Sequence, residues 1–132
     1  MLAMKDKSIP KLRKKLTKVF NEFIRLRDKD TLCISCGREP VVHAGHYFPT
    51  SSYPQPSMRF FEMNVHGQGI SCNFFQEGNR QGYREGLIKR YGEDILRILD
   101  VKRSIKASPW HYFEYLAMID VYEKKVAQAK NV

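Results

Sequence analysis

The sequence has no long hydrophobic run, and it contains only three cysteines in 132 residues. A membrane-spanning helix needs about 20 predominantly apolar residues, so no membrane span is expected. The first residues, MLAMKDKSIPKLRKK, contain no apolar signal core, which favours a cytoplasmic protein over a secreted one. A chain of this length is predicted to form one domain with a modest core.

Acidic residues are scarce at the start of the chain. Residues 1–30 contain ten Lys and Arg residues against four Asp and Glu residues, so they carry six of the nine net positive charges. This asymmetry favours a polyanionic partner, most often a nucleic acid. The alternative is a basic surface helix that has no partner.

One amphipathic helix is predicted over residues 10–27. Its apolar residues recur at the i, i+3, i+4, i+7, i+8 spacing of a single helical face. They are Leu16, Val19, Phe20, Phe23 and Ile24. Lys11, Lys14, Lys15 and Lys18 gather around the first turns of the other side.

The middle of the chain, residues 32–73, has little apolar material for its length. Short strands are predicted at 40–44 and 59–63, on either side of the Pro- and Ser-rich stretch YFPTSSYPQPS, which reads as a loop. A bound metal would supply the order that so small a core cannot provide.

Helical patterns return after Cys72. The segment YREGLIKRYG predicts a helix that ends at Gly92, and EDILRILDVKR predicts another. Ser108 and Pro109 are expected to open a last helix, as its N-cap and first helical residue. A stripe along that helix favours core packing, with a homodimer seam as the alternative. The stripe comprises Tyr112, Tyr115, Leu116, Ile119, Tyr122 and Val126.

The cysteine spacing indicates a metal site. Cys33 and Cys36 form a C-x2-C knuckle, and Cys72 can return to it to give three thiolate ligands for Zn²⁺. Gly69 stands where a second C-x2-C would place a cysteine. The fourth ligand is therefore left open between His66, water and none. The alternative is that no metal binds and Cys72 is a small buried apolar residue.

The stretch HAGH, residues 43–46, contains two histidines that can bind one metal or divide the work. Phosphodiester hydrolysis needs a base for water and a cation for the charge that grows on the phosphate. One histidine can be that base if a neighbour such as Asn64 orients it. Asn79 can offer an oxygen to Mg²⁺.

The order Cys-x2-Cys, His, Asn, Cys, Asn resembles that of the HNH, or ββα-metal, nucleases. The segments FIRLRDKDTLCISCG, AGHY, RFFEMNVHGQ and CNFFQEGN are similar to the NinG (Rap) family of phage recombination proteins, which are structure-specific endonucleases for branched DNA. The resemblance implies a single α+β nuclease domain over 1–132. A zinc-knuckle ββα-metal core in 31–92 would follow a basic helix in 1–30 and precede C-terminal helices in 93–132.

The same resemblance implies roles for individual residues. His46 would be the general base, Asn64 the middle polar position of the HNH pattern, and Asn79 a ligand of the catalytic metal. His43 stands where the family has a metal-binding carboxylate, which favours Mn²⁺ over Mg²⁺. Gly69 replaces a family cysteine, so the zinc site departs from the family pattern.

The resemblance therefore predicts a metal-dependent endonuclease that cleaves Holliday junctions and D-loops. Such an enzyme would come from a phage or prophage, act in the bacterial cytoplasm, and work as a homodimer because a junction needs two cuts. The alternatives are a non-catalytic zinc-knuckle protein that binds branched DNA and a sequence-specific HNH nuclease. The residues expected to contact DNA are Lys11, Arg13, Lys14, Lys15, Lys18, Arg80 and Arg84.

Overall fold

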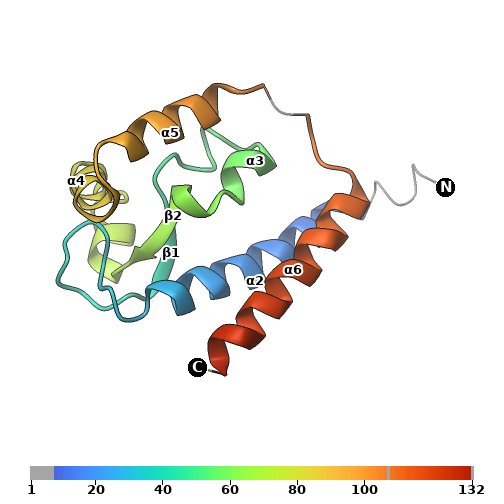
Figure 1. The fold of residues 1–132 in the computed structure, drawn as a ribbon, viewed down its shortest axis with the longest axis horizontal. Helices are drawn as coiled ribbons and strands as arrows, with labels where there is room; N and C mark the ends of the chain where they lie inside the picture. Colours follow the sequence, from blue (N-terminus) through green and yellow to red (C-terminus); the bar gives the residue numbers. More distant parts are fainter. Residues whose placement is uncertain (1–7, 107, 132) are drawn as a thin grey trace.

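The computed structural model describes residues 8–106 and 108–131, which form a mostly helical α+β protein with a two-stranded sheet (Figure 1). The helices and strands are α2 (Ile9–Asp28), β1 (His43–His46), α3 (Pro56–Arg59), β2 (Val65–Gln68), α4 (Arg80–Tyr91), α5 (Asp94–Ser104) and α6 (Tyr112–Lys130). A 3-10 turn, η1 (Glu62–Asn64), leads into β2, and a π-helical turn, η2 (Ser71–Phe75), follows it.

Helices α2 and α6 lie side by side along one edge of the molecule (Figure 1). The helix predicted over 10–27 is confirmed, since its apolar face is buried against α6 and the sheet. This core contains Leu16, Phe20, Ile24, Phe60, Val65, Tyr115, Ile119 and Tyr122. Four of the six stripe residues, Tyr115, Ile119, Tyr122 and Val126, are buried within the chain, which supports core packing over a dimer seam.

The start of α6 differs from the prediction. The helix begins at Tyr112, with His111 as its N-cap, and not at Ser108 and Pro109. The backbone N–H of His111 donates to Glu114 Oε2 at 2.7 Å, and the His111 side chain accepts from the N3 backbone. This reciprocal capping box satisfies N–H groups that the first turn leaves free, so it fixes the start of the helix.

The two strands pair antiparallel, with His43 opposite Gln68 and His46 opposite Val65. The first predicted strand, 40–44, begins three residues too early. The second prediction, 59–63, is wrong because Pro56 opens the short helix α3 and the chain then enters η1. The real second strand, β2, is buried at every position, so its sequence shows no alternation of polar and apolar residues.

A second core lies beneath α4 and α5 and contains Ile34, Tyr83, Leu87, Ile95 and Leu99. The predicted end of α4 at Gly92 is confirmed. The φ angle of Gly92 is 90°, which residues with a side chain rarely adopt. A Cβ on Gly86 would lie 1.9 Å from the carbonyl oxygen of Ile34. Glycine weakens the helix but lets it contact the cysteine knuckle directly.

Within the described residues, no helix combines the length and apolarity that crossing a membrane would require.

Candidate functional site

Cys33, Cys36 and Cys72 come together in space. Their three sulfur atoms all lie within 4.8 Å of one another, although Cys72 is distant in sequence. A tight turn holds the first two: the N–H of Cys33 donates to Glu39 O at 2.8 Å, and the N–H of Gly37 donates to Cys33 O at 2.8 Å. Thiolates in this arrangement fit a metal such as zinc.

Asn79 belongs to the cysteine cluster. Its Nδ2 donates to Cys72 Sγ at 3.3 Å, and its Oδ1 accepts from the N–H of Gly82 at 3.2 Å, which caps α4. Burial raises the pKa of Cys72 to about 11, and the hydrogen bond from Asn79 partly opposes this shift. Both polar ends of Asn79 are thus engaged at the cluster and the helix cap, which does not support its predicted role as a ligand of a catalytic metal.

His66 is buried on β2 between two tyrosines. Tyr83 donates to Gly45 O at 2.8 Å, so its oxygen accepts from His66 Nδ1 at 3.2 Å, while His66 Nε2 accepts from Tyr91 at 2.9 Å. Burial is the main reason that the pKa of His66 is lowered to about 3. With both ring nitrogens engaged outside the cysteine cluster, His66 does not have the position predicted for a fourth zinc ligand.

His46 lies at the end of β1 with one ring nitrogen fixed. Its Nε2 donates to the carbonyl oxygen of Arg59 at 2.9 Å, which assigns the proton to Nε2 and leaves Nδ1 with a free lone pair. Burial lowers the pKa of His46, and the bond to Arg59 O only partly offsets it. The imidazole is therefore neutral at pH 7, the state that a general base needs.

Asn64 is fully buried and holds the backbone around His46. Its Oδ1 accepts from the N–H of Phe48 at 2.8 Å, and its Nδ2 donates to Phe48 O and Met58 O, both at 3.1 Å. The predicted hydrogen bond from Asn64 that orients His46 is absent among these contacts. The orienting bond comes from Arg59, the residue next to Met58, so Asn64 acts on His46 through the backbone.

His43 and His46 do not share a site. Side chains three residues apart on a strand point to opposite faces. The His43 ring lies against Phe74 with ring centroids 4.9 Å apart, and its Nδ1 is buried without a partner. Among residues 8–106 and 108–131, no cluster of three or more His, Cys, Asp or Glu ligand atoms contains either histidine. The predicted division of labour, in which His43 holds the catalytic metal beside the His46 base, is not supported by these positions.

A hollow of about 230 Å³ lies beside His46, and its wall includes Asn73, Glu77 and Arg80. Asn73 and Glu77 were not identified as site residues from the sequence. Asn73 directly follows Cys72, so the fold of the cysteine cluster also fixes its position. The Asn73 amide and the Glu77 carboxylate offer oxygen atoms, which Mg²⁺ and Mn²⁺ prefer. Asn73 and Glu77 are thus the residues of the hollow that could offer oxygen ligands to such a cation.

Gly45 also lines this hollow. A Cβ on Gly45 would lie 1.8 Å from Oε1 of the buried Gln68. Gln68 Nε2 donates to Ser35 Oγ at 2.8 Å and to Gly78 O at 2.7 Å, so this amide ties β2 to the knuckle and to the approach to α4. Glycine at position 45 leaves room for that connection.

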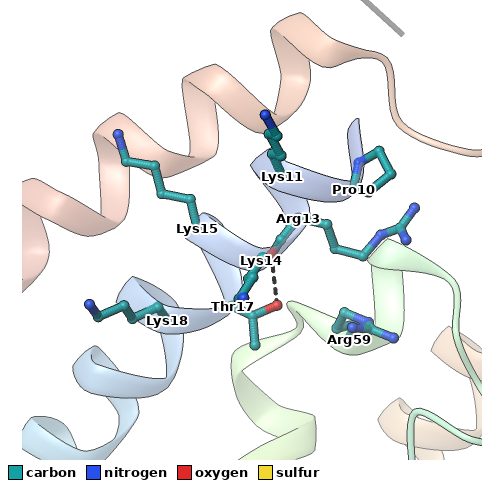
Figure 2. A pocket seen from close by; sticks show the side chains of 8 residues that line it. All are labelled: Pro10, Lys11, Arg13, Lys14, Lys15, Thr17, Lys18 and Arg59. Atoms are coloured by element: carbon teal, nitrogen blue, oxygen red, sulfur yellow. Dashed lines mark hydrogen bonds between the residues drawn. The ribbon is translucent and has the colours of Figure 1, made fainter. Parts of the chain in front are cut away.

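A basic groove of about 770 Å³ runs along the N-terminal half of α2 and reaches α3 (Figure 2). Arg59 connects the groove to His46, since its side chain lines the groove while its carbonyl oxygen holds the imidazole. Arg80 lines the His46 hollow and donates to Tyr47 O, and Arg84 is exposed on α4. The groove is lined by Pro10, Lys11, Arg13, Lys14, Lys15, Thr17, Lys18 and Arg59.

The fold and the cysteine cluster define a small α+β protein with a knuckle that can bind a metal such as zinc. A family model described as "Bacteriophage Lambda NinG protein" matches residues 2–131, and the chain belongs to this family. "Protein ninG" of Escherichia phage lambda is 35% identical over 120 residues, which are 89% of this chain and 57% of that protein. "Protein ninG" of Salmonella phage P22 is 36% identical over the same shares.

The chain thus spans less than two thirds of the length of these relatives. No solved structure matches it significantly.

Proposed function

We propose that the chain is a metal-dependent endonuclease that cleaves branched DNA, such as Holliday junctions and D-loops, during phage recombination in the bacterial cytoplasm. The observation that carries this proposal is the state of His46. Arg59 O fixes its Nε2–H, burial keeps the ring neutral, and Nδ1 is left to accept a proton. These are the requirements for a general base that activates water.

In the proposed reaction, His46 Nδ1 takes a proton from the attacking water, and the imidazolium that forms is held by Arg59 O. Asn73 and Glu77 would hold Mg²⁺ or Mn²⁺ in the adjacent hollow. When bound, the cation would stabilise negative charge on the phosphate and the leaving oxygen. Because these donors are oxygens and His43 lies elsewhere, the expected preference for Mn²⁺ loses its basis.

The basic groove supports a DNA substrate. Its lysines carry exposed ammonium groups that can contact phosphates without reading bases. A strand bound there would run past Arg59, whose backbone positions His46. Contacts of this kind suit recognition of DNA shape over sequence, which favours the junction nuclease over a sequence-specific HNH enzyme.

Two exposed aromatic side chains support a branched substrate. Phe74 is 66% exposed and Phe75 is 80% exposed, and both follow Asn73 at the rim of the hollow. Aromatic rings can stack on bases that have lost a neighbour. Such bases occur at branch points and are absent from a continuous duplex.

Zinc at the three cysteines would hold the knuckle against α4 and thereby fix Asn73. We also propose a homodimer, because resolution of a junction requires two cuts. Its interface would lie outside the buried α6 stripe. The second candidate function is a non-catalytic zinc-knuckle protein for branched DNA. The departure at Gly69 and the separation of His43 from His46 favour that reading.

The substitution His46→Ala tests the proposal against this second candidate. Cleavage of a four-way junction should fall by about 100-fold or more, the usual contribution of a general base. Junction affinity should change less than twofold, because a neutral imidazole contributes no phosphate-binding charge. Leu116→Ala is the control, since Leu116 is 50% exposed on α6. Equal cleavage by wild type and His46→Ala would rule out His46 as the base.

A further inference from the structure

The three cysteines leave one position of a tetrahedral zinc site open, and structural zinc sites are almost always four-coordinate. Gly69, three residues before Cys72, has no side chain that could fill this open position. Asn79 presents its Nδ2–H to Cys72 Sγ, and His66 is occupied by two tyrosines. The fourth ligand must come from another residue or from solvent.

Glu39 fills the space beside Gly69. A Cβ built on Gly69 would lie 2.0 Å from Glu39 Oε2, 2.5 Å from Glu39 Cβ and 2.9 Å from Glu39 Cδ. A side chain at position 69 and the Glu39 carboxylate therefore compete for one volume. The glutamate lies where a cysteine at position 69 would begin.

The backbone of Glu39 is part of the cysteine knuckle. Its N–H donates to Cys36 Sγ at 3.5 Å, and its carbonyl oxygen accepts from the N–H of Cys33 at 2.8 Å. Its Oε2 accepts from the N–H of Ser71 at 3.2 Å, one residue before Cys72. The carboxylate thus bridges the two segments that carry the cysteines.

We propose that Glu39 supplies the fourth ligand of the zinc ion, which gives a Cys3Glu site. The cluster of mutually close ligand atoms consists of the three sulfurs, so ligation requires Glu39 to rotate its carboxylate from Ser71 N–H toward them. A carboxylate carries the same charge as the thiolate it replaces and is an accepted zinc ligand. This inference rests on the zinc site of the proposed function and does not depend on nuclease activity.

The test uses Co²⁺ as a spectroscopic probe in the full chain, followed by competition with Zn²⁺. Wild type should show the visible bands of tetrahedral Co²⁺ with three thiolates. Glu39→Gln should shift these bands and weaken Zn²⁺ binding by about tenfold or more, while the exposed carboxylate variant Glu85→Gln should leave both unchanged. Identical spectra and Zn²⁺ affinity for wild type and Glu39→Gln would overturn the proposal in favour of water.

A rescue variant keeps the test decisive if Glu39→Gln folds poorly. Glu39→Gly combined with Gly69→Cys removes the Cβ that would lie 2.5 Å from a Cβ at position 69. This double variant should restore Zn²⁺ affinity and increase the sulfur-to-cobalt charge-transfer band, because a fourth thiolate replaces the carboxylate. Failure of this double variant to bind more tightly than Glu39→Gly alone would contradict a shared ligand position. Junction cleavage is recorded separately: an inactive protein with the expected spectra would refute the nuclease and retain the Cys3Glu site.

Discussion

The helix pair α2–α6 and the middle region, residues 31–79, are stabilised in different ways. The pair buries aromatic and aliphatic side chains, with Phe20 edge-on to Tyr122 at 4.9 Å between ring centroids. The middle region contains two four-residue strands, and hydrogen bonds and cysteines connect its turns. The first can fold by apolar burial, whereas the second depends on specific polar contacts.

Arg27 and Asp28, at the end of α2, connect the two regions. Asp28 Oδ2 accepts from the N–H of Gly67 at 2.8 Å, and Arg27 Nη2 donates to Val65 O at 2.7 Å. Burial alone would raise the pKa of Asp28, but the hydrogen bonds from Arg27 and Gly67 hold it below its usual value. A stable helix thus orients β2, and the pair acts as a scaffold for the site.

Metal removal should produce the largest difference in stability between the two regions. Structural zinc contributes on the order of 10 kcal/mol in small zinc domains, so a strong chelator should expose residues 31–79 to amide hydrogen exchange. Helices α2 and α6 should stay protected. Mass spectrometry of the exchanged peptides measures both, and Cys72→Ser should reproduce the chelator effect. Unchanged exchange in the middle region would show that it is stable without metal.

Phe20→Ala should destabilise the helix pair and leave zinc binding in the middle region unchanged. Phe20 is fully buried, so its truncation should lower the free energy of unfolding by about 3–5 kcal/mol. The number of zinc ions bound by the folded protein should not change. Denaturant titration and metal analysis measure these quantities, with Phe113→Ala, at an exposed position of α6, as control. A parallel loss of zinc would mean that the regions are not separable.

Acidification should destabilise the protein through His66. Its pKa is about 3 in the folded chain, against 6.5 for an ordinary histidine, so the unfolded chain binds the proton more readily. The folded state therefore has its full stability with respect to His66 above pH 6.5, and this stability is lost as the pH falls toward 3. Between pH 7 and pH 5 the loss from this group is about 2 kcal/mol.

Denaturant titrations of His66→Gln at both pH values check this effect. The variant is expected to be less stable at pH 7 because Tyr83 and Tyr91 lose their partner, but its loss on acidification should be smaller by that amount. Leu116→Ala, at an exposed position of α6, is the control. The same pH dependence in His66→Gln and wild type would assign the effect to other groups.

The smallest expected effect concerns DNA binding by the basic groove on α2. Lys14→Ala with Lys15→Ala should weaken binding to junction and duplex alike and reduce the slope of log affinity against log salt by about two. Fluorescence anisotropy at several salt concentrations measures that slope. Lys124→Ala with Lys130→Ala, on α6, removes the same charge away from the groove. Equal slopes for the two double variants would remove α2 from the DNA interface.

The sequence predicted what depends on periodicity and local chemistry. The spacing from Leu16 to Ile24 predicted α2, and the cysteine spacing predicted the cluster that includes Cys72. The strands were misplaced because β2 is buried on both faces and Pro56 opens a helix. Tertiary burial, which local patterns do not encode, decides β2, whereas Pro56 is a local helix-start signal that the strand prediction overlooked.

The site was predicted in part for a similar reason. His46 could be chosen by its motif, but its partner is the backbone of Arg59, and any residue could supply that carbonyl. Asn79 and Asn73 lie close in sequence, so either could be chosen as a metal ligand. The structure shows that the Asn79 side-chain oxygen already accepts from the N–H of Gly82 in the cap of α4. His43 and His46 were assigned to one site because they lie three residues apart in one motif, but on a strand this spacing directs the two side chains to opposite faces.

The most direct test is cleavage of a labelled four-way junction beside a matched linear duplex, with Mg²⁺, with Mn²⁺ and with EDTA. Wild type should cut the junction only when metal is present and leave the duplex intact, and His46→Ala should cut the junction more slowly by about 100-fold or more. Tight junction binding without cleavage under any metal would contradict the nuclease and identify the chain as a DNA-binding protein.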